Sequence, residues 1–202
     1  NNAHMLQVCN GHAGGDHMTT PAAFNTSLLS MLDALDAKLP AQSHVAIVGL
    51  VDGRILWDTM HARTHPLGST YAELYAFLSC HDDNPCWGWL NSNETWRNFT
   101  SNRAAELNAV SAATAATRTY KNFDLHYFAV DFRDVLNKWV AAGNDPGLLI
   151  EPADGFHPSQ VGHMLQAQAF YDYLEANTPE LLGAVNPNNA AIAKQFGSQG
   201  GE

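Results

Sequence analysis

Short apolar segments alternate along the chain with stretches whose apolar residues recur at helical spacing, and this alternation limits the folds open to it. Residues 44–50 are nearly all apolar, as are residues 125–130, which is expected of strands buried on both faces. Residues 148–150 predict a third, shorter strand. Helices that alternate with buried strands predict an α/β fold, here a three-layer sandwich around a mostly parallel sheet.

The helical segments have local start and stop signals. Thr20 and Pro21 predict an N-cap followed by the first helical residue, and Pro40 ends that segment. Neither an internal repeat nor a linker divides the 202 residues, so we expect one domain. Three strands make a thin sheet, and we expect the rest of it in polypeptide outside this chain. Four further helices are predicted, over residues 71–80, 103–118, 132–140 and 158–176, with loop after Pro179.

Composition argues against a nucleic-acid partner and against a transmembrane helix. The formal charge is −10 and only 10 residues are Lys or Arg, with no basic cluster. Affinity for nucleic acid depends on Lys and Arg that neutralise phosphates, so we expect no nucleic-acid partner. No stretch approaches the roughly 20 apolar residues that a transmembrane helix needs.

Cysteines and glycosylation motifs point to the secretory pathway. Three Asn-x-Ser/Thr triplets begin at Asn25, Asn93 and Asn98, and each is a candidate glycosylation site. The cysteines are Cys9, Cys80 and Cys86. An odd count in a secreted protein suggests a disulfide partner outside the chain. Cys80 and Cys86 are close enough to pair with each other, and spacing alone does not settle the connectivity.

The segment before the last predicted helix carries the most chemistry. Pro158 is suited to the first helical position, which would make His157 the N-cap, with an extended backbone and a ring directed away from the helix. Asp154 precedes it by three residues, and Gly155 permits a tight turn that brings the carboxylate to the imidazole Nδ1–H. The carboxylate favours the imidazolium form and the helix N-terminus disfavours it. This balance predicts a general base that works near neutral pH. The alternative is an Asp154 that only caps a turn, which is common for this spacing.

Asp154 and His157 match the catalytic Asp and His of SGNH hydrolases, also called GDSL esterases, which stand three residues apart near the C-terminus. Within that superfamily the chain resembles the acyloxyacyl hydrolases from about Val8 to its end. The similar stretches include Leu149-Ile150-Glu151-Pro152 leading into Asp154-Gly155-Phe156-His157-Pro158, His65-Pro66-Leu67-Gly68, Asn84-Pro85-Cys86 and Phe196-Gly197.

The resemblance implies an SGNH-hydrolase-like fold and a serine esterase that removes secondary fatty acyl chains from the lipid A part of lipopolysaccharide, and also acts on phospholipids. His157 would take the proton of the serine hydroxyl, and Asp154 would orient His157. The resemblance further implies a saposin-like small subunit bonded to Cys80, a disulfide between Cys9 and Cys86, and a secreted or lysosomal (vesicular) location. Calcium is compatible with the complete protein, but the chain has no Asp-rich loop with ligand spacing.

Two catalytic blocks of the family are absent. No Gly-Asp-Ser occurs, and Gly15-Asp16-His17 is the nearest match. The Gly-x-Asn-Asp block should precede Val8, where the chain reads Met5-Leu6-Gln7. We therefore expect residues 1–202 to be the C-terminal portion of a single SGNH hydrolase domain, without the serine and the saposin-like part and inactive in isolation. The alternatives are a general GDSL esterase acting on other esters and a non-catalytic lipid- or glycan-binding module.

Two further groups of residues have both a functional and a structural interpretation. His61 and His65 stand four residues apart near Asp58, as metal ligands on a helix would, but Pro66 disfavours a helix there, so we expect a structural or hydrogen-bonding role. Four aromatic residues are candidates for an acyl-chain groove, with ordinary packing as the favoured interpretation: Trp87, Trp89, Trp96 and Phe99.

Overall fold

The computed structural model describes residues 9, 18–129 and 131–197, which divide into two compact units, Asn1–Phe170 and Tyr171–Glu202. The boundary between the units falls inside α7. In chain order, the elements are α2 (Pro21–Asp36), β1 (Ser43–Val48), α3 (Arg54–Met60), α4 (Tyr71–Cys80), α5 (Glu94–Thr117), β2 (Phe123–Phe128), α6 (Phe132–Ala141), the 3-10 helix η3 (Pro146–Leu149), α7 (Gln160–Asn177), the 3-10 helix η4 (Pro179–Leu182) and α8 (Asn189–Phe196).

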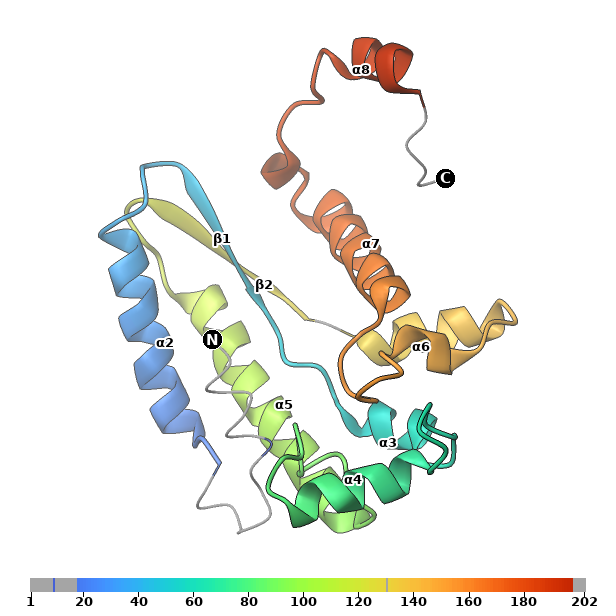
Figure 1. The fold of residues 1–202 in the computed structure, drawn as a ribbon. Coiled ribbons are helices and arrows are strands. Elements are labelled where there is room, and N and C mark those ends of the chain that lie inside the picture. Colours follow the sequence, from blue (N-terminus) through green and yellow to red (C-terminus); the bar gives the residue numbers. More distant parts are fainter. Residues whose placement is uncertain (1–8, 10–17, 130, 198–202) are drawn as a thin grey trace. The chain divides into compact units, whose positions relative to one another are not determined.

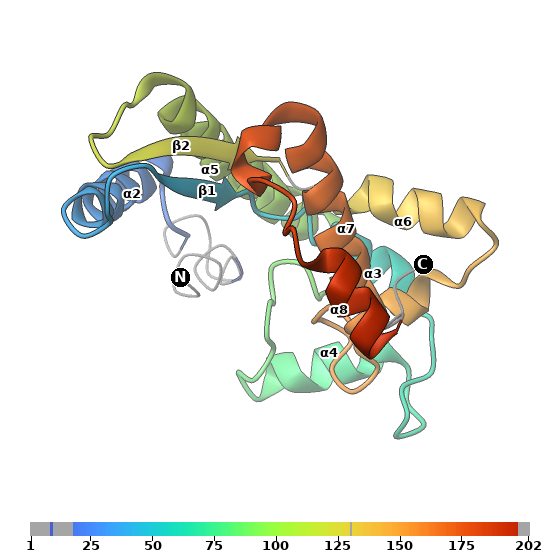
Figure 2. The same ribbon diagram turned by 90° about the horizontal axis from the view of Figure 1, so that it is seen from above.

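The two strands lie side by side and form a parallel sheet (Figure 1; Figure 2), in which Ser43 pairs with Phe123 and Val48 with Phe128. The chain passes through α3, α4 and α5 between them, as a parallel pair requires. The predicted mixed α/β architecture with a parallel sheet is therefore confirmed. Within the described residues, the sheet has two strands.

The sheet is buried chiefly on the face that meets α2 and α5. Its side chains on that face join one apolar cluster with those of the two helices, which includes Leu28, Leu32, Val45, Phe123 and Leu125. Burial along β1 alternates, and Val48 on the opposite face is 56% exposed. The prediction that this strand is buried on both faces is thus wrong for β1. On the opposite face, α7 contacts the sheet through Phe170, whose ring packs on Phe128 of β2.

Side-chain caps mark the starts of several helices, and the predicted cap at Thr20 is confirmed. Thr20 accepts a hydrogen bond from the Ala23 N–H, and Thr70 and Glu73 form a reciprocal capping box at α4. The start of α5 was predicted too late. Asn93 caps that helix through the N–H groups of Thr95 and Trp96.

Three other elements differ from the prediction. The short helix α3 follows the Asp52–Gly53 turn and was not expected. Residues 148–150 do not form a strand, because Pro146 begins a 3-10 helix and Ile150 makes only an isolated bridge to Pro158. The segment after Pro179, predicted as loop, contains η4 and α8.

One disulfide joins Cys9 to Cys86, which are both buried, and Cys80 is exposed and free. The resemblance implied this Cys9–Cys86 pairing. The bond closes a loop with a sequence separation of 77 residues. Chain-entropy arguments assign such a closure about 4.5 kcal/mol of stability. No helix among the described residues is long and apolar enough to cross a membrane.

Candidate active site

Asp154 and His157 are in direct contact in the turn before α7. The imidazole Nδ1 lies 2.7 Å from Asp154 Oδ2, while Asp154 Oδ1 accepts hydrogen bonds from the backbone N–H groups of Phe156 and His157. Gly155 has a positive φ of 63°, which allows the chain to turn back between the two side chains. The carboxylate thus both caps the turn and binds the ring.

The expected N-cap role of His157 is wrong. The helix begins at Gln160, and Ser159 caps it by accepting the Gly162 N–H through its hydroxyl. The backbone of residues 157–159 is instead tied to residues 149–151. Glu151 donates its N–H to the carbonyl of His157, and Ser159 donates to the carbonyl of Leu149. His157 therefore stands outside the helix. The predicted effect of the helix dipole on the imidazolium form depended on His157 being the N-cap, and Ser159 has that position instead.

Three side chains from the α3–α4 region hold the turn by its carbonyl groups. His65 Nε2 lies 3.0 Å from the carbonyl oxygen of Ala153. Tyr71 donates its hydroxyl to the carbonyl of Pro152 and Tyr75 donates to that of Gly155, each at 2.6 Å. The other ring nitrogen of His65 accepts the Leu67 N–H, which leaves Nε2 as the donor to Ala153. All three anchoring side chains are buried. The position of the turn is therefore fixed by residues of another part of the chain.

The electrostatics favour a charged Asp154. Burial acts to raise the pKa of its carboxyl, but the hydrogen bonds from the His157 ring and from two backbone N–H groups outweigh burial and leave the pKa below its ordinary value. A charged carboxylate can only accept hydrogen bonds, so the His157 proton that it binds must sit on Nδ1. Nε2 is then the basic nitrogen of a neutral ring. The lone pair on Nε2, which would accept a proton, is directed away from Asp154, as a general base requires.

His157 lines a largely apolar cavity of about 460 Å³ in the first unit. The cavity lies beyond the carboxyl end of β1, where α/β proteins place their ligand sites. Its wall includes residues of α2, β1, α3 and α6 and of the loops around them, among them the Asp154 turn. The apolar lining includes Leu28, Met31, Ile47, Leu50, Leu56, Trp89, Phe132, Ile150 and Phe156. Polar atoms are few, and Asn108 binds both the N–H and the carbonyl of Leu50 with its amide. A ligand here would be mainly hydrocarbon.

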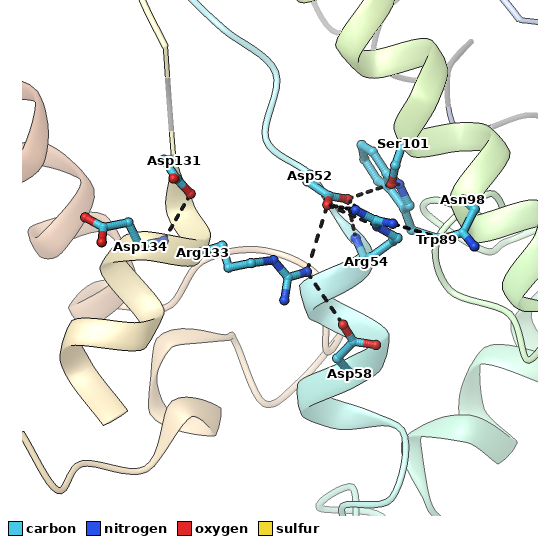
Figure 3. A network of polar contacts seen from close by, with 9 residues as sticks. All are labelled: Asp52, Arg54, Asp58, Trp89, Asn98, Ser101, Asp131, Arg133 and Asp134. Atoms are coloured by element: carbon cyan, nitrogen blue, oxygen red, sulfur yellow. Dashed lines mark hydrogen bonds and ion pairs between the residues drawn. The ribbon is translucent and has the colours of Figure 1, made fainter. Parts of the chain in front are cut away.

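A polar network stands behind the Trp89 side of this cavity (Figure 3). The Trp89 indole N–H donates to the Ser101 hydroxyl, which donates to Asp52 at 2.6 Å. Arg54 binds both oxygens of the same carboxylate, and Arg133 reaches Asp52 and Asp58 from the start of α6. The ring of Trp89 also lies against Gly53, where an added Cβ would be 2.2 Å from the ring. The network therefore fixes the indole plane that forms the wall.

Burial tends to raise the pKa of the Asp52 carboxyl, yet hydrogen bonds from Arg54 and Ser101 lower it below the ordinary value overall. Asp52 is thus a charged acceptor that organises the wall. Neither Asp52 nor Ser101 lines the cavity, so we assign them a supporting role.

The remaining candidates separate in the structure. His61 is bonded to the Trp57 carbonyl and His65 to Ala153, so both have the hydrogen-bonding role that was favoured over a metal site. Trp89 lines the cavity, whereas Trp87, Trp96 and Phe99 pack on one another. Of the glycosylation candidates, Asn25 and Asn93 are exposed, and the half-buried Asn98 accepts a hydrogen bond from Arg54.

Residues 8–170 match the family model of GDSL-like lipases and acylhydrolases. The chain belongs to that family. It is 42% identical over 200 residues to the acyloxyacyl hydrolases of Mus musculus and Homo sapiens, and 42% identical over 201 residues to that of Oryctolagus cuniculus. Each alignment covers 96% of this chain and 35% of the relative. The chain thus spans about a third of the length of the curated relatives that it matches.

Sequence reasoning identified the Asp–His pair but missed its anchors. Tyr75 looked like an ordinary member of a short helix, and the contact of His65 with the turn crosses 88 residues. This segment was marked only by two stretches similar to the acyloxyacyl hydrolases, around His65 and at Thr70-Tyr71-Ala72. Nothing in the sequence marked Asn108 or Ser101 as neighbours of the cavity, because the position of α5 beside the end of β1 is a property of the fold.

Proposed function

We propose that this chain supplies the Asp–His pair of a serine esterase that hydrolyses secondary, acyloxyacyl-linked fatty acyl esters of lipid A, and also acts on phospholipids. The observation that carries the proposal is the position of His157. Its ring is bound to a carboxylate at 2.7 Å and also lines an apolar cavity large enough for a hydrocarbon chain. Family membership and 42% identity to three acyloxyacyl hydrolases support the reaction class.

In the proposed reaction, Nε2 of His157 accepts the proton of a serine hydroxyl as the oxygen attacks the ester carbonyl. The acyl group transfers to the serine, and the protonated ring then gives its proton to the leaving alkoxide. Water attacks the acyl-enzyme in a second round, again with His157 as base. Asp154 keeps the ring oriented and stabilises its cation. The serine belongs to polypeptide outside these 202 residues, so the isolated chain should show no turnover.

The decisive experiment uses the complete protein that contains this chain. Release of secondary and of primary acyl chains from lipid A is measured for the unaltered protein and for Asp154→Asn. Asn cannot impose the same tautomer on the ring, so the variant should keep its fold and lose roughly 10⁴-fold in kcat. Asp83→Asn is the matched control, because Asp83 is exposed and far along the chain from the turn.

Each alternative has its own result. A loss of less than about tenfold in Asp154→Asn would remove Asp154 from the mechanism. Equal release of primary and secondary chains would make the protein a general GDSL esterase. Binding of lipid A without turnover by the complete protein would make it a binding module. Turnover by the isolated 202 residues that serine-directed reagents abolish would contradict an external serine.

We further propose that Cys80 bonds a saposin-like small subunit. It is exposed and free, while the other two cysteines are joined to each other. The disulfide, together with the glycosylation triplets at Asn25, Asn93 and Asn98, supports a secreted or lysosomal location.

A further inference from the structure

Three titratable side chains gather on the sheet face opposite α2 and α5. His44 on β1 stands directly across from Asp124 on β2 in the parallel register, and His126 follows Asp124 by two residues. Successive residues of a strand point to opposite faces, so these three share one face. Their neighbours Val45 and Leu125 point the other way, into the apolar cluster beneath α2 and α5. The register of the sheet, and not a sequence motif, brings the three together.

The three side chains already converge on a common centre. His44 Nδ1 lies 2.5 Å from Asp124 Oδ1, and His126 Nε2 lies 2.8 Å from Asp124 Oδ2. One ligand atom from each residue falls within 4.8 Å of the other two. Zinc bonds to nitrogen and oxygen are about 2.0–2.2 Å long, so tetrahedral ligand atoms are about 3.3 Å apart. Rotations of the side chains that widen the two hydrogen bonds by less than about 1 Å would make room for the ion.

We propose that His44, Asp124 and His126 bind a divalent zinc-class metal ion across β1 and β2. Two imidazoles and one carboxylate are ligands that zinc, cobalt and nickel accept, whereas calcium and magnesium prefer sites made of oxygen. Three protein ligands leave a fourth position for water. The site is accessible, because the side chains of His44 and Asp124 are 46% and 49% exposed, and the His126 ring is more enclosed at 19%.

This site is separate from the candidate active site. None of its three residues lines the cavity that His157 lines. His44 lies at the amino end of β1 and Val48, which does line the cavity, lies four residues further on, roughly 13 Å along an extended strand. The ion would act as a clamp, since it ties together two strands whose paired residues are 80 positions apart in the chain. The proposal does not rest on the esterase reaction.

The test measures zinc binding by the 202-residue chain after removal of metals with a chelator. Competition with a chromophoric chelator gives the affinity, and visible absorption of the cobalt-loaded protein reports a tetrahedral site. We expect at least a tenfold loss of affinity in His126→Gln and in His44→Gln. The matched control is His163→Gln, an exposed histidine of α7, which should stay within about twofold of the unaltered protein.

Thermal unfolding gives an independent readout. Zinc at about 100 times its Kd should raise the Tm of the unaltered chain and of the control by roughly 5–10 °C. At the same concentration it should raise the Tm of either ligand variant by at most about half as much, and calcium should raise none of them. Unchanged zinc affinity in both ligand variants, or an equal loss in the control, would overturn the site. If His126→Gln does not fold, the more exposed His44→Gln decides the question.

Discussion

The hydroxyl of Tyr75 should be worth more to stability than that of Tyr71, although the two make hydrogen bonds of the same length to the same turn. Both donate at 2.6 Å, Tyr75 to the carbonyl of Gly155 and Tyr71 to that of Pro152. The substitutions Tyr75→Phe and Tyr71→Phe each remove one oxygen atom and leave the ring. They therefore compare two acceptors whose surroundings differ.

The two carbonyl groups differ in whether water can replace the lost hydroxyl donor. Gly155 is buried, and its bond from Tyr75 is fully enclosed. An acceptor left unpaired in such a place costs about 1–3 kcal/mol. Pro152 is exposed, so water can replace the hydroxyl of Tyr71. That loss should be limited to about 0.5–1.5 kcal/mol, the net worth of an ordinary hydrogen bond.

Urea unfolding of the 202-residue chain gives both free energies, with Tyr171→Phe as the control because Tyr171 is 49% exposed. We expect Tyr75→Phe to lose more stability than Tyr71→Phe, and the control to change by less than about 0.5 kcal/mol. In the complete protein, Tyr75→Phe should also lower kcat more than it raises KM, because the turn carries His157. A loss in Tyr75→Phe equal to or smaller than that in Tyr71→Phe would refute the reasoning from burial.

Three other outcomes follow from the site. Gly53→Ala should destabilise the chain by about 1–3 kcal/mol and change its tryptophan emission, because the new Cβ would meet the Trp89 ring at 2.2 Å. The stability that Asp52 contributes through its lowered folded pKa should be complete above the ordinary value of 3.8 and lost as the pH falls through the folded value, so Asp52→Asn should show a shallower loss of unfolding free energy on acidification. In the complete protein, Cys80→Ser should release any disulfide-bonded small subunit on a non-reducing gel while the internal disulfide stays intact.

Helix starts that depend on residues adjacent in the chain could be predicted from the sequence. The Thr20–Pro21 and Thr70 starts were predictable, because a cap and its helix are neighbours in the chain. The late prediction for α5 has a local cause too. Its first turns contain Trp96, Asn98 and Thr100, which have weak helix propensity. Burial of Thr100 and of its neighbours against the core stabilises these turns, and burial cannot be read from propensity.

The misplaced start of α7 shows two local rules in competition. Pro158 at the first helical position and Ser159 as the N-cap are both favourable starts. The bridge between Ile150 and Pro158, with the hydrogen bonds of Glu151 and Ser159, decides between them. It holds the chain extended through residue 158, so the helix can begin only at Gln160. The prediction failed because the deciding contacts come from a strand-like pairing with residues 149–151.

The same distinction explains what could be foreseen of the site. A carboxylate three residues from an imidazole can be found in the sequence, since the turn that joins them is local. A pair of this kind becomes a general base only when the ring is held at a cavity, and that depends on His65, Tyr71 and Tyr75, some 80 residues earlier. Each of these anchors binds a backbone carbonyl, so the hydrogen bond itself does not depend on the side chain of the residue that it holds. Pairwise patterns between side chains therefore cannot identify the anchors. The fold that brings α4 against the turn is the information that the Asp–His motif lacks.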